Sequence, residues 1–150
     1  MLVGLAITGV SVSTSVSAAP VNCRAVTGTL VEKVEVPPPA VQTVGEMTGN
    51  LIGKYHFVVD NLPPVETPTP GIIFFTGTSS LENGEGVLKF SDAITTSVER
   101  PGNFSSYMSI LGGSGKYSDA SGYLHLYGNV DLVTGYGQAD YKGTVCTPIE

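Results

Sequence analysis

The stretch 112–128 constrains the fold of this chain more than any other, because a glycine-rich segment runs directly into an alternating one. Three glycines fall within residues 112–115. Glycine reaches positive φ at no steric cost, so this segment predicts a sharp reversal of the chain. The period then becomes two: Leu124 and Leu126 share one face of a predicted strand, and tyrosine and histidine side chains occupy the other. Such a turn fixes the register of the strands beside it.

Composition indicates a single all-β domain. The chain has 150 residues, enough for one core. Only 13% of the residues are charged, glycine occurs 19 times and tryptophan is absent. This balance argues against disorder and is typical of β-proteins with many tight turns. The net charge of −6 and the scattered basic residues leave no basic stripe, so we expect no nucleic-acid partner.

Residues 1–18 are predicted to be a secretory signal peptide, followed by a single barrel domain over 19–150. The segment is uncharged, and an apolar run is followed by small residues with a cleavage site after Ala18. It lacks the basic start of such signals, so either its beginning is truncated or the segment is a buried strand or an N-terminal anchor. The apolar run is too short to cross a bilayer, and we expect no membrane span after its removal. The predicted location is secreted or periplasmic.

Two cysteines lie at the ends of the mature chain. Cys23 follows the predicted cleavage site and Cys146 lies near the C-terminus. A disulfide between them would close a loop of about 120 residues, which is worth up to about 4 to 5 kcal/mol on the loop-entropy model. Two free thiols are the alternative, favoured if the protein stays in the cytosol. The pair offers no zinc or redox motif.

Alternation predicts seven to eight strands and no helix. The predicted strands are 26–36, the glycine-interrupted region 41–59, 71–81, 86–94, 104–111, 123–130 and 136–146. Asn83-Gly84 is the strongest hairpin signal. Glycine bends and tied chain ends favour a closed antiparallel β-barrel of about eight strands, whose interior is filled or holds one small ligand. A β-sandwich is the alternative, weakened by the absence of tryptophan and by the terminal positions of the cysteines.

The candidate catalytic groups are few. No nucleophile elbow, phosphate loop or paired metal ligands occur, so we expect no metal and no cofactor. Ionisable side chains on strand-like segments include Asp92, and the catalytic candidates are Glu46, His125 and Asp140. Any such group that faces the lumen would have a perturbed pKa and could act as an acid or base. A solvated position on the outer face is the ordinary alternative for each.

Four residues are candidates for lining the lumen: Tyr107, Tyr123, His125 and Tyr127. If they face inward, their phenols and imidazole could orient a polar group on an apolar ligand. If the intervening leucines point inward, the same side chains form an exposed aromatic stripe or a subunit contact, which hydrophobic patterning favours. A shift of one residue in register exchanges the two faces.

The segment Gly112–Gly122 resembles the Gly-Gly-Thr-Gly-Arg-Tyr/Phe-x-x-Ala-x-Gly signature of the allene oxide cyclase and dirigent barrel superfamily, with Ser114 for threonine and Lys116 for arginine. Gly45-Glu46 followed by Gly53 is similar to the early hairpin of the same group. The Tyr-x-Gly-x-x-Cys ending at 141–146 resembles that of small exported bacterial members without assigned activity.

The resemblance implies a calycin-like, eight-stranded antiparallel barrel with an apolar lumen, often assembled as homodimers or homotrimers. Members of the superfamily steer cyclisations or couplings of reactive hydrophobic molecules by holding them in one conformation. Two functions are therefore expected. The first is a secreted barrel that binds a hydrophobic small molecule and steers its cyclisation or coupling; whether it is an enzyme stays open, and an enzyme would be an isomerase or cyclase. The alternative is a non-catalytic exported structural or interaction module with a filled barrel.

Overall fold

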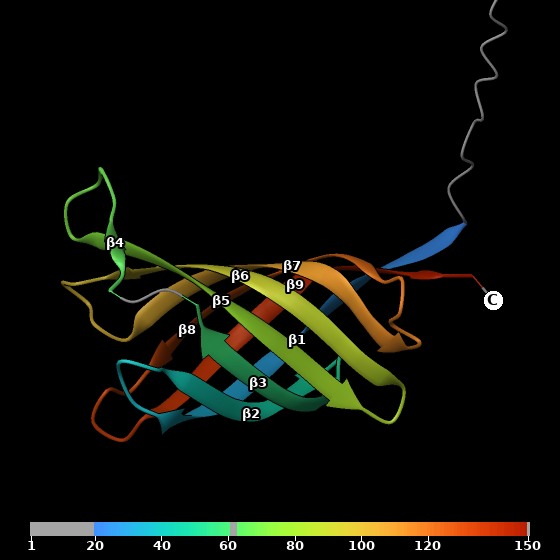
Figure 1. Cartoon of the computed structure of the whole chain (residues 1–150), viewed down its shortest axis with the longest axis horizontal. Helices are drawn as coiled ribbons and strands as arrows, with labels where there is room; N and C mark the ends of the chain where they lie inside the picture. The colour runs from blue at the N-terminus through green and yellow to red at the C-terminus, as the bar shows by residue number, and fades with distance from the viewer. Residues whose placement is uncertain (1–19, 61–62, 150) are drawn as a thin grey trace, which may run out of the picture.

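The computed structural model describes residues 20–60 and 63–149. The predicted signal peptide, 1–18, lies outside the described residues. Within the described ranges the secondary structure consists of nine strands (Figure 1): β1 Val21–Val36, β2 Gln42–Gly49, β3 Gly53–Val59, β4 Val65–Glu66, β5 Ile72–Asn83, β6 Gly86–Ser97, β7 Asn103–Gly115, β8 Ser121–Val130 and β9 Tyr136–Pro148. A search of these residues finds no helix long and apolar enough to cross a membrane.

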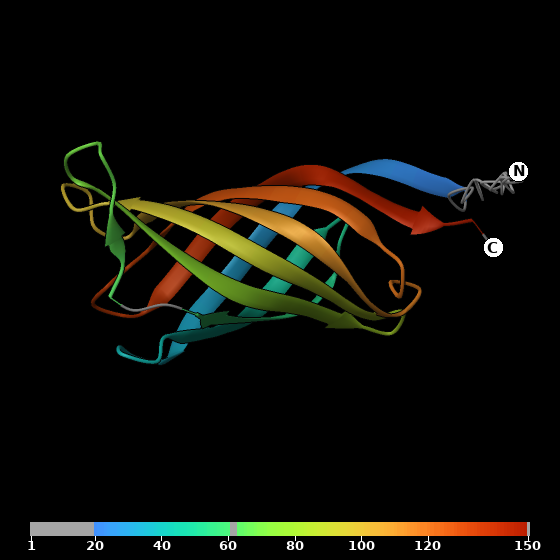
Figure 2. The ribbon, with the colours of Figure 1, turned by 45° about the horizontal axis from the view of Figure 1, so that its top comes forward.

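The strands form one antiparallel sheet that closes on itself. Neighbours follow the order β3-β2-β1-β9-β8-β7-β6-β5-β4, and β3 also pairs with β5. Eight strands therefore form a closed barrel, while the short β4 pairs with the start of β5 outside the ring. The second view shows the strands wound obliquely around a common interior (Figure 2). The predicted closed barrel is confirmed, and the sandwich alternative is wrong.

The two ends of the barrel differ. The connections β1–β2, β6–β7 and β8–β9 lie at one end, called here the open end (Figure 1). The turns β2–β3, β5–β6 and β7–β8 lie at the other, called the closed end. The predicted region 41–59 is two strands, because the chain reverses between β2 and β3. Asn83-Gly84 makes the predicted hairpin between β5 and β6.

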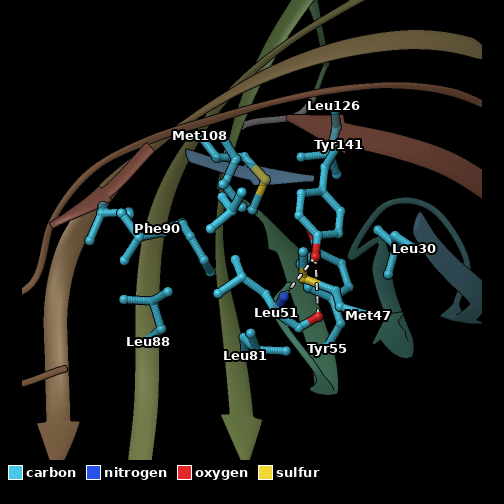
Figure 3. Close-up of a cluster of buried hydrophobic side chains, with 14 of the residues drawn as sticks. Leu30, Met47, Leu51, Tyr55, Leu81, Leu88, Phe90, Met108, Leu126 and Tyr141 are labelled. Carbon is cyan, nitrogen blue, oxygen red and sulfur yellow. Dashed lines mark hydrogen bonds between the residues drawn. The ribbon is translucent and has the colours of Figure 1, made fainter. Parts of the chain in front are cut away.

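The closed end is filled by the barrel's own side chains (Figure 3). Alternate residues of each strand point inward, as Leu88 and Phe90 do on β6, so residues from all the barrel strands meet. The fully buried large side chains are Tyr117, Tyr141, Phe90, Leu30, Met47, Leu51, Leu81, Leu88, Met108, Leu124, Leu126 and Val26. This packing closes the interior at that end of the barrel.

The glycine-rich segment has a different position from the predicted one. Residues 112–115 belong to β7, and the reversal into β8 occupies residues 116–120. Leu88 pairs with Gly113 and Phe90 with Ile110, so β7 carries an extra residue opposite β6. Gly112 adopts a φ of 83° at this bulge. A β-bulge bends its strand and increases the local twist, which helps the sheet to close.

A disulfide joins the first and last strands of the chain, which are neighbours in the sheet. Cys23 of β1 pairs in register with Cys146 of β9, and the two form a disulfide with a Cα–Cα distance of 3.9 Å. The predicted bridge is confirmed. Because β1 and β9 are the first and last strands in the chain and pair with each other, the disulfide ties the two chain ends together within the barrel wall.

Candidate functional site

The open end leads into a cavity of about 470 Å³ inside the barrel. Its walls are mainly apolar, with aromatic rings of Phe57, Phe75 and Phe104 from β3, β5 and β7. Aliphatic side chains such as Val34 and Leu132 lie toward the rim. A volume of a few hundred Å³ with apolar walls is typical of small-molecule sites. The barrel is therefore packed at one end and hollow at the other.

Two buried carboxyl groups line this cavity. Glu32 on β1 is 8% exposed and Asp92 on β6 is 2% exposed. Thr43 Oγ1 donates a hydrogen bond to Glu32 Oε2 at 2.5 Å. Ser79 Oγ donates one to Asp92 Oδ2 at 2.7 Å. A buried carboxyl is costly unless it is hydrogen-bonded or paired, so this position marks a specialised part of the lumen.

Burial changes the protonation of both groups. Desolvation raises the pKa of Asp92 to about 7, with the hydrogen bond from Ser79 opposing the rise and the charges of Asp60 and Glu32 adding to it. Desolvation also raises the pKa of Glu32, and the hydrogen bond from Thr43 opposes it. A carboxyl with a pKa near neutrality can give or accept a proton under physiological conditions. The lumen therefore contains a group suited to acid–base chemistry.

Tyr55 of β3 adds a phenol to the same lining. Its side chain is buried. Desolvation raises the pKa of Tyr55 well above its usual value, and the charges of Asp92 and Glu32 act in the same direction. The phenol therefore stays neutral and can serve as a hydrogen-bond donor or acceptor.

Ser106 of β7 completes the polar group. It is 3% exposed and lines the cavity, and its Oγ has no hydrogen-bond partner among the described residues. It lies near enough to Asp92 to favour the carboxylate slightly. Nearly all buried polar atoms in folded proteins are hydrogen-bonded, and an exception calls for an explanation. A bound molecule with a polar atom at this depth would satisfy the Ser106 hydroxyl.

The tyrosine candidates lie on the outer surface. Tyr107, Tyr123 and Tyr127 are 41% to 49% exposed, and the rings of Tyr107 and Tyr123 stack with centroids 5.4 Å apart. Leu124 and Leu126 point inward instead. The idea that these tyrosines line the lumen is wrong, because the apolar alternate positions of β8 take the inward face.

The three catalytic candidates also face outward. Glu46 and Asp140 are exposed. His125 is half-buried on the outer face of β8, where its Nε2 lies 2.8 Å from Ser105 Oγ. The barrel wall separates all three from the lumen, since inward positions alternate with theirs. Within the described ranges no group of three or more histidine, cysteine, aspartate or glutamate side chains could hold a metal ion.

Of the ionisable groups on strand-like segments, Asp92 is the one that faces the lumen, and Glu32, which was not among them, joins it there. The sequence contained a signal for both positions. Leu30 and Glu32 fall in the same phase of β1, and Phe90 and Asp92 in the same phase of β6. The alternation that predicts an inward leucine and phenylalanine also places both carboxyls inward. The expectation that charged side chains face solvent masked this signal.

Comparisons with known proteins bear on the fold. No family model matches the sequence. No curated protein matches it either. Among solved structures, the pterocarpan synthase dirigent protein GePTS1 superposes with a TM-score of 0.53 at 15% identity, covering 91% of this chain and 100% of that one. The pterocarpan synthase dirigent protein PsPTS1 gives a TM-score of 0.52 at 15% identity, covering 86% and 97%. The chain therefore has a dirigent-like β-barrel fold.

Proposed function

We propose that this barrel binds a hydrophobic small molecule in its lumen, with the apolar part of the ligand toward the open end and a polar group against the buried carboxyls. The observation that carries the proposal is the apolar cavity of about 470 Å³ that contains Glu32, Asp92 and the unpartnered hydroxyl of Ser106. A structural module with a filled barrel would have no need for buried carboxyls beside an empty volume.

The finer proposal is that the lumen holds its ligand in one conformation and so steers a cyclisation or coupling. Rigid strands on all sides position the aromatic walls, and restricting a flexible reactant to a reactive conformer lowers its barrier without a covalent intermediate. Asp92, with a pKa of about 7, could exchange a proton during such a step. The two neighbours named as pterocarpan synthase dirigent proteins support a steering role by analogy of fold.

Export is the proposed location. Disulfides persist in oxidising compartments, and the Cys23–Cys146 bridge supports an exported protein. A secreted or periplasmic barrel would meet its ligand outside the cytosol. The signal peptide proposed for residues 1–18 would direct the export.

The binding proposal is tested with Nile red, a neutral fluorophore whose emission rises in apolar surroundings. Thr95 and Thr96 are neighbours on β6 that offer a matched pair: Thr96 lines the cavity and Thr95 is exposed on the outer face. Thr96→Trp should fill the lumen and abolish the emission increase, whereas Thr95→Trp should leave it intact. Thermal unfolding followed by circular dichroism checks that both variants fold. An unchanged emission in the wild-type protein, or equal emission in both variants, would contradict lumen binding.

A further inference from the structure

The two buried carboxyls have no countercharge. Among the described residues that line the cavity there is no lysine, arginine or histidine. The one ion pair within residues 20–60 and 63–149 joins Lys116 to Glu85 at the closed end, far from the carboxyls. Aspartate and glutamate are rarely buried without a partner. Glu32 accepts a hydrogen bond from Thr43, and Asp92 accepts one from Ser79 and has the Ser106 hydroxyl close by, which leaves acceptor capacity on both groups.

Ser106, beside Asp92, is a further polar group of the same cavity. Its buried Oγ lines the same cavity and lacks a partner among the described residues. A hydroxyl oxygen can accept a hydrogen bond as well as donate one. Glu32, Asp92 and Ser106 therefore each present an oxygen that can accept a further hydrogen bond in the same cavity. The phenol oxygen of Tyr55 is a fourth acceptor there. The site as a whole needs hydrogen-bond donors, and a positive charge would neutralise the carboxyls.

The cavity is apolar at its rim and polar further inside. The rim at the open end is apolar, with Val34, Val98 and Leu132 among its residues. The carboxyls lie deeper: Glu32 is the next inward residue after Val34 on β1, and Asp92 lies in the middle of β6. A ligand with a polar head and an apolar body would match this order only if its head enters first. Such a gradient favours amphiphiles over uniformly apolar molecules.

We propose that the ligand is a hydrophobic amine that enters the cavity with its amino group first; this proposal rests on the proposed binding of a small molecule in the lumen. The basic nitrogen would donate hydrogen bonds to Glu32, Asp92 and Ser106, and the apolar body would lie in the aromatic part of the cavity. An ammonium group supplies three donors and the missing positive charge. A carboxylate head of the same length would place like charges together in a region of low dielectric constant, and is rejected. A neutral alcohol is intermediate, since it offers one donor and no charge.

The charge on the lumen sets the pH dependence of this binding. The ionisable groups that face or influence Asp92 are Glu32 on β1, Tyr55 on β3 and Asp60 just after β3. Tyr55 stays neutral, so the negative charge in the lumen grows as the two carboxyls lose their protons. Amine binding should therefore strengthen as pH rises from 5 to 8, because the amine stays protonated over this range (its ammonium pKa is near 10). Alcohol binding should show no such increase.

The test uses dodecylamine, dodecanol and dodecanoate, which share one tail length, as competitors of Nile red below their micelle-forming concentrations. At pH 8 the concentration of amine that displaces half of the Nile red should be at least about tenfold lower than that of the alcohol. The carboxylate should need the highest concentration of the three. Asp92→Asn should remove most of the preference for the amine and keep alcohol binding. Asp140→Asn, which removes an exposed carboxyl on the outer face, should leave the preference unchanged.

The outcomes separate the two proposals. If Nile red does not bind to the wild-type protein, lumen binding itself is wrong, and the amine site fails with it. If Nile red binds and the three competitors displace it equally, or the carboxylate competes best, the amine proposal alone is wrong. An amine preference that survives in Asp92→Asn, in a variant that still binds the alcohol, would also overturn it.

Discussion

Tyr141 on β9 is hydrogen-bonded to the turn at Leu51, which lies 90 residues earlier in the chain. The Tyr141 hydroxyl accepts a hydrogen bond from the Leu51 backbone N–H at 2.9 Å and lies 3.2 Å from the carbonyl oxygen of Leu51 (Figure 3). It also donates a hydrogen bond to the carbonyl oxygen of Thr48 at 2.9 Å. The side chains of Tyr141 and Leu51 are fully buried. One phenol thus ties β9 to the β2–β3 turn across the closed end of the barrel.

Tyr141→Phe removes this hydroxyl and leaves the ring in place. The buried Leu51 N–H loses its partner, and an unsatisfied buried donor costs about 1–3 kcal/mol. We expect the free energy of unfolding, measured by urea denaturation, to fall by that amount. Tyr127→Phe removes a phenol oxygen from a half-exposed ring on the outer face and is the control, expected within about 0.5 kcal/mol of wild type. Equal stability of the two variants would contradict the role of the Tyr141 contact.

The close contact at Gly113 predicts a second stability effect. A Cβ atom at Gly113 would lie 1.7 Å from the backbone oxygen of Val87 on β6, so the two strands would have to separate. We expect Gly113→Ala to lower the free energy of unfolding by about 1–3 kcal/mol or more. A Cβ at Gly84, in the β5–β6 turn, would meet nothing within 4 Å. Gly84→Ala should therefore be near neutral, and a loss at Gly84 as large as that at Gly113 would show that the strand contact is not the cause.

Local pattern predicted much of the fold and little of the site. The phases of β6 and β8, the Asn83-Gly84 hairpin and the Cys23–Cys146 bridge could be predicted because alternation, turn chemistry and chain-end cysteines are short-range signals. The glycine segment was placed too early as a turn, because its conformation depends on the bulge it forms against β6. That pairing is not visible in either strand alone.

Asp92 was among the ionisable groups considered from the sequence, but Glu32 escaped prediction because the polarity at its position is inverted. Val31 is exposed and Glu32 is buried, the opposite of what hydrophobic patterning predicts for neighbours on a strand. The position is tolerated because Thr43, on the adjacent strand β2, donates a hydrogen bond to the carboxylate. β6 and β7 are neighbours in the sheet, but β1 pairs with neither of them. Glu32 on β1 therefore shares a cavity with Asp92 and Ser106 only because the sheet closes into a barrel.

The disulfide should contribute strongly to stability. It closes a loop with a sequence separation of 123 residues, and loss of a native bridge costs about 2–5 kcal/mol. Cys23→Ser combined with Cys146→Ser should lower the midpoint of urea unfolding accordingly. Alkylation of the protein purified from its own source without reductant, followed by mass measurement, should find no reactive thiol. Two alkylated cysteines in the unreduced sample would show that the bridge does not form in the cell.

The buried carboxyl of Asp92 predicts how stability depends on pH. Its pKa is about 7 in the folded protein, and an aspartate in an unfolded chain has a pKa of about 3.9. Between these values the native state keeps a proton that the unfolded state has lost, so the free energy of unfolding falls as pH rises from about 4 to about 7 and levels off above. The raised pKa of Glu32 acts in the same direction.

Asp92→Asn isolates the contribution of this group. The difference in free energy of unfolding, variant minus wild type, should rise with pH across the window from about 4 to about 7, by at most about 1.4 kcal/mol per pH unit, and stay constant above it. Ser79→Ala removes the hydrogen bond that lowers the pKa of Asp92, so its window should extend to higher pH. Urea unfolding at each pH measures both variants. A difference curve for Asp92→Asn that is flat from pH 4 to 7 would mean that Asp92 is charged throughout, with solvent or an ion reaching the carboxylate in the lumen.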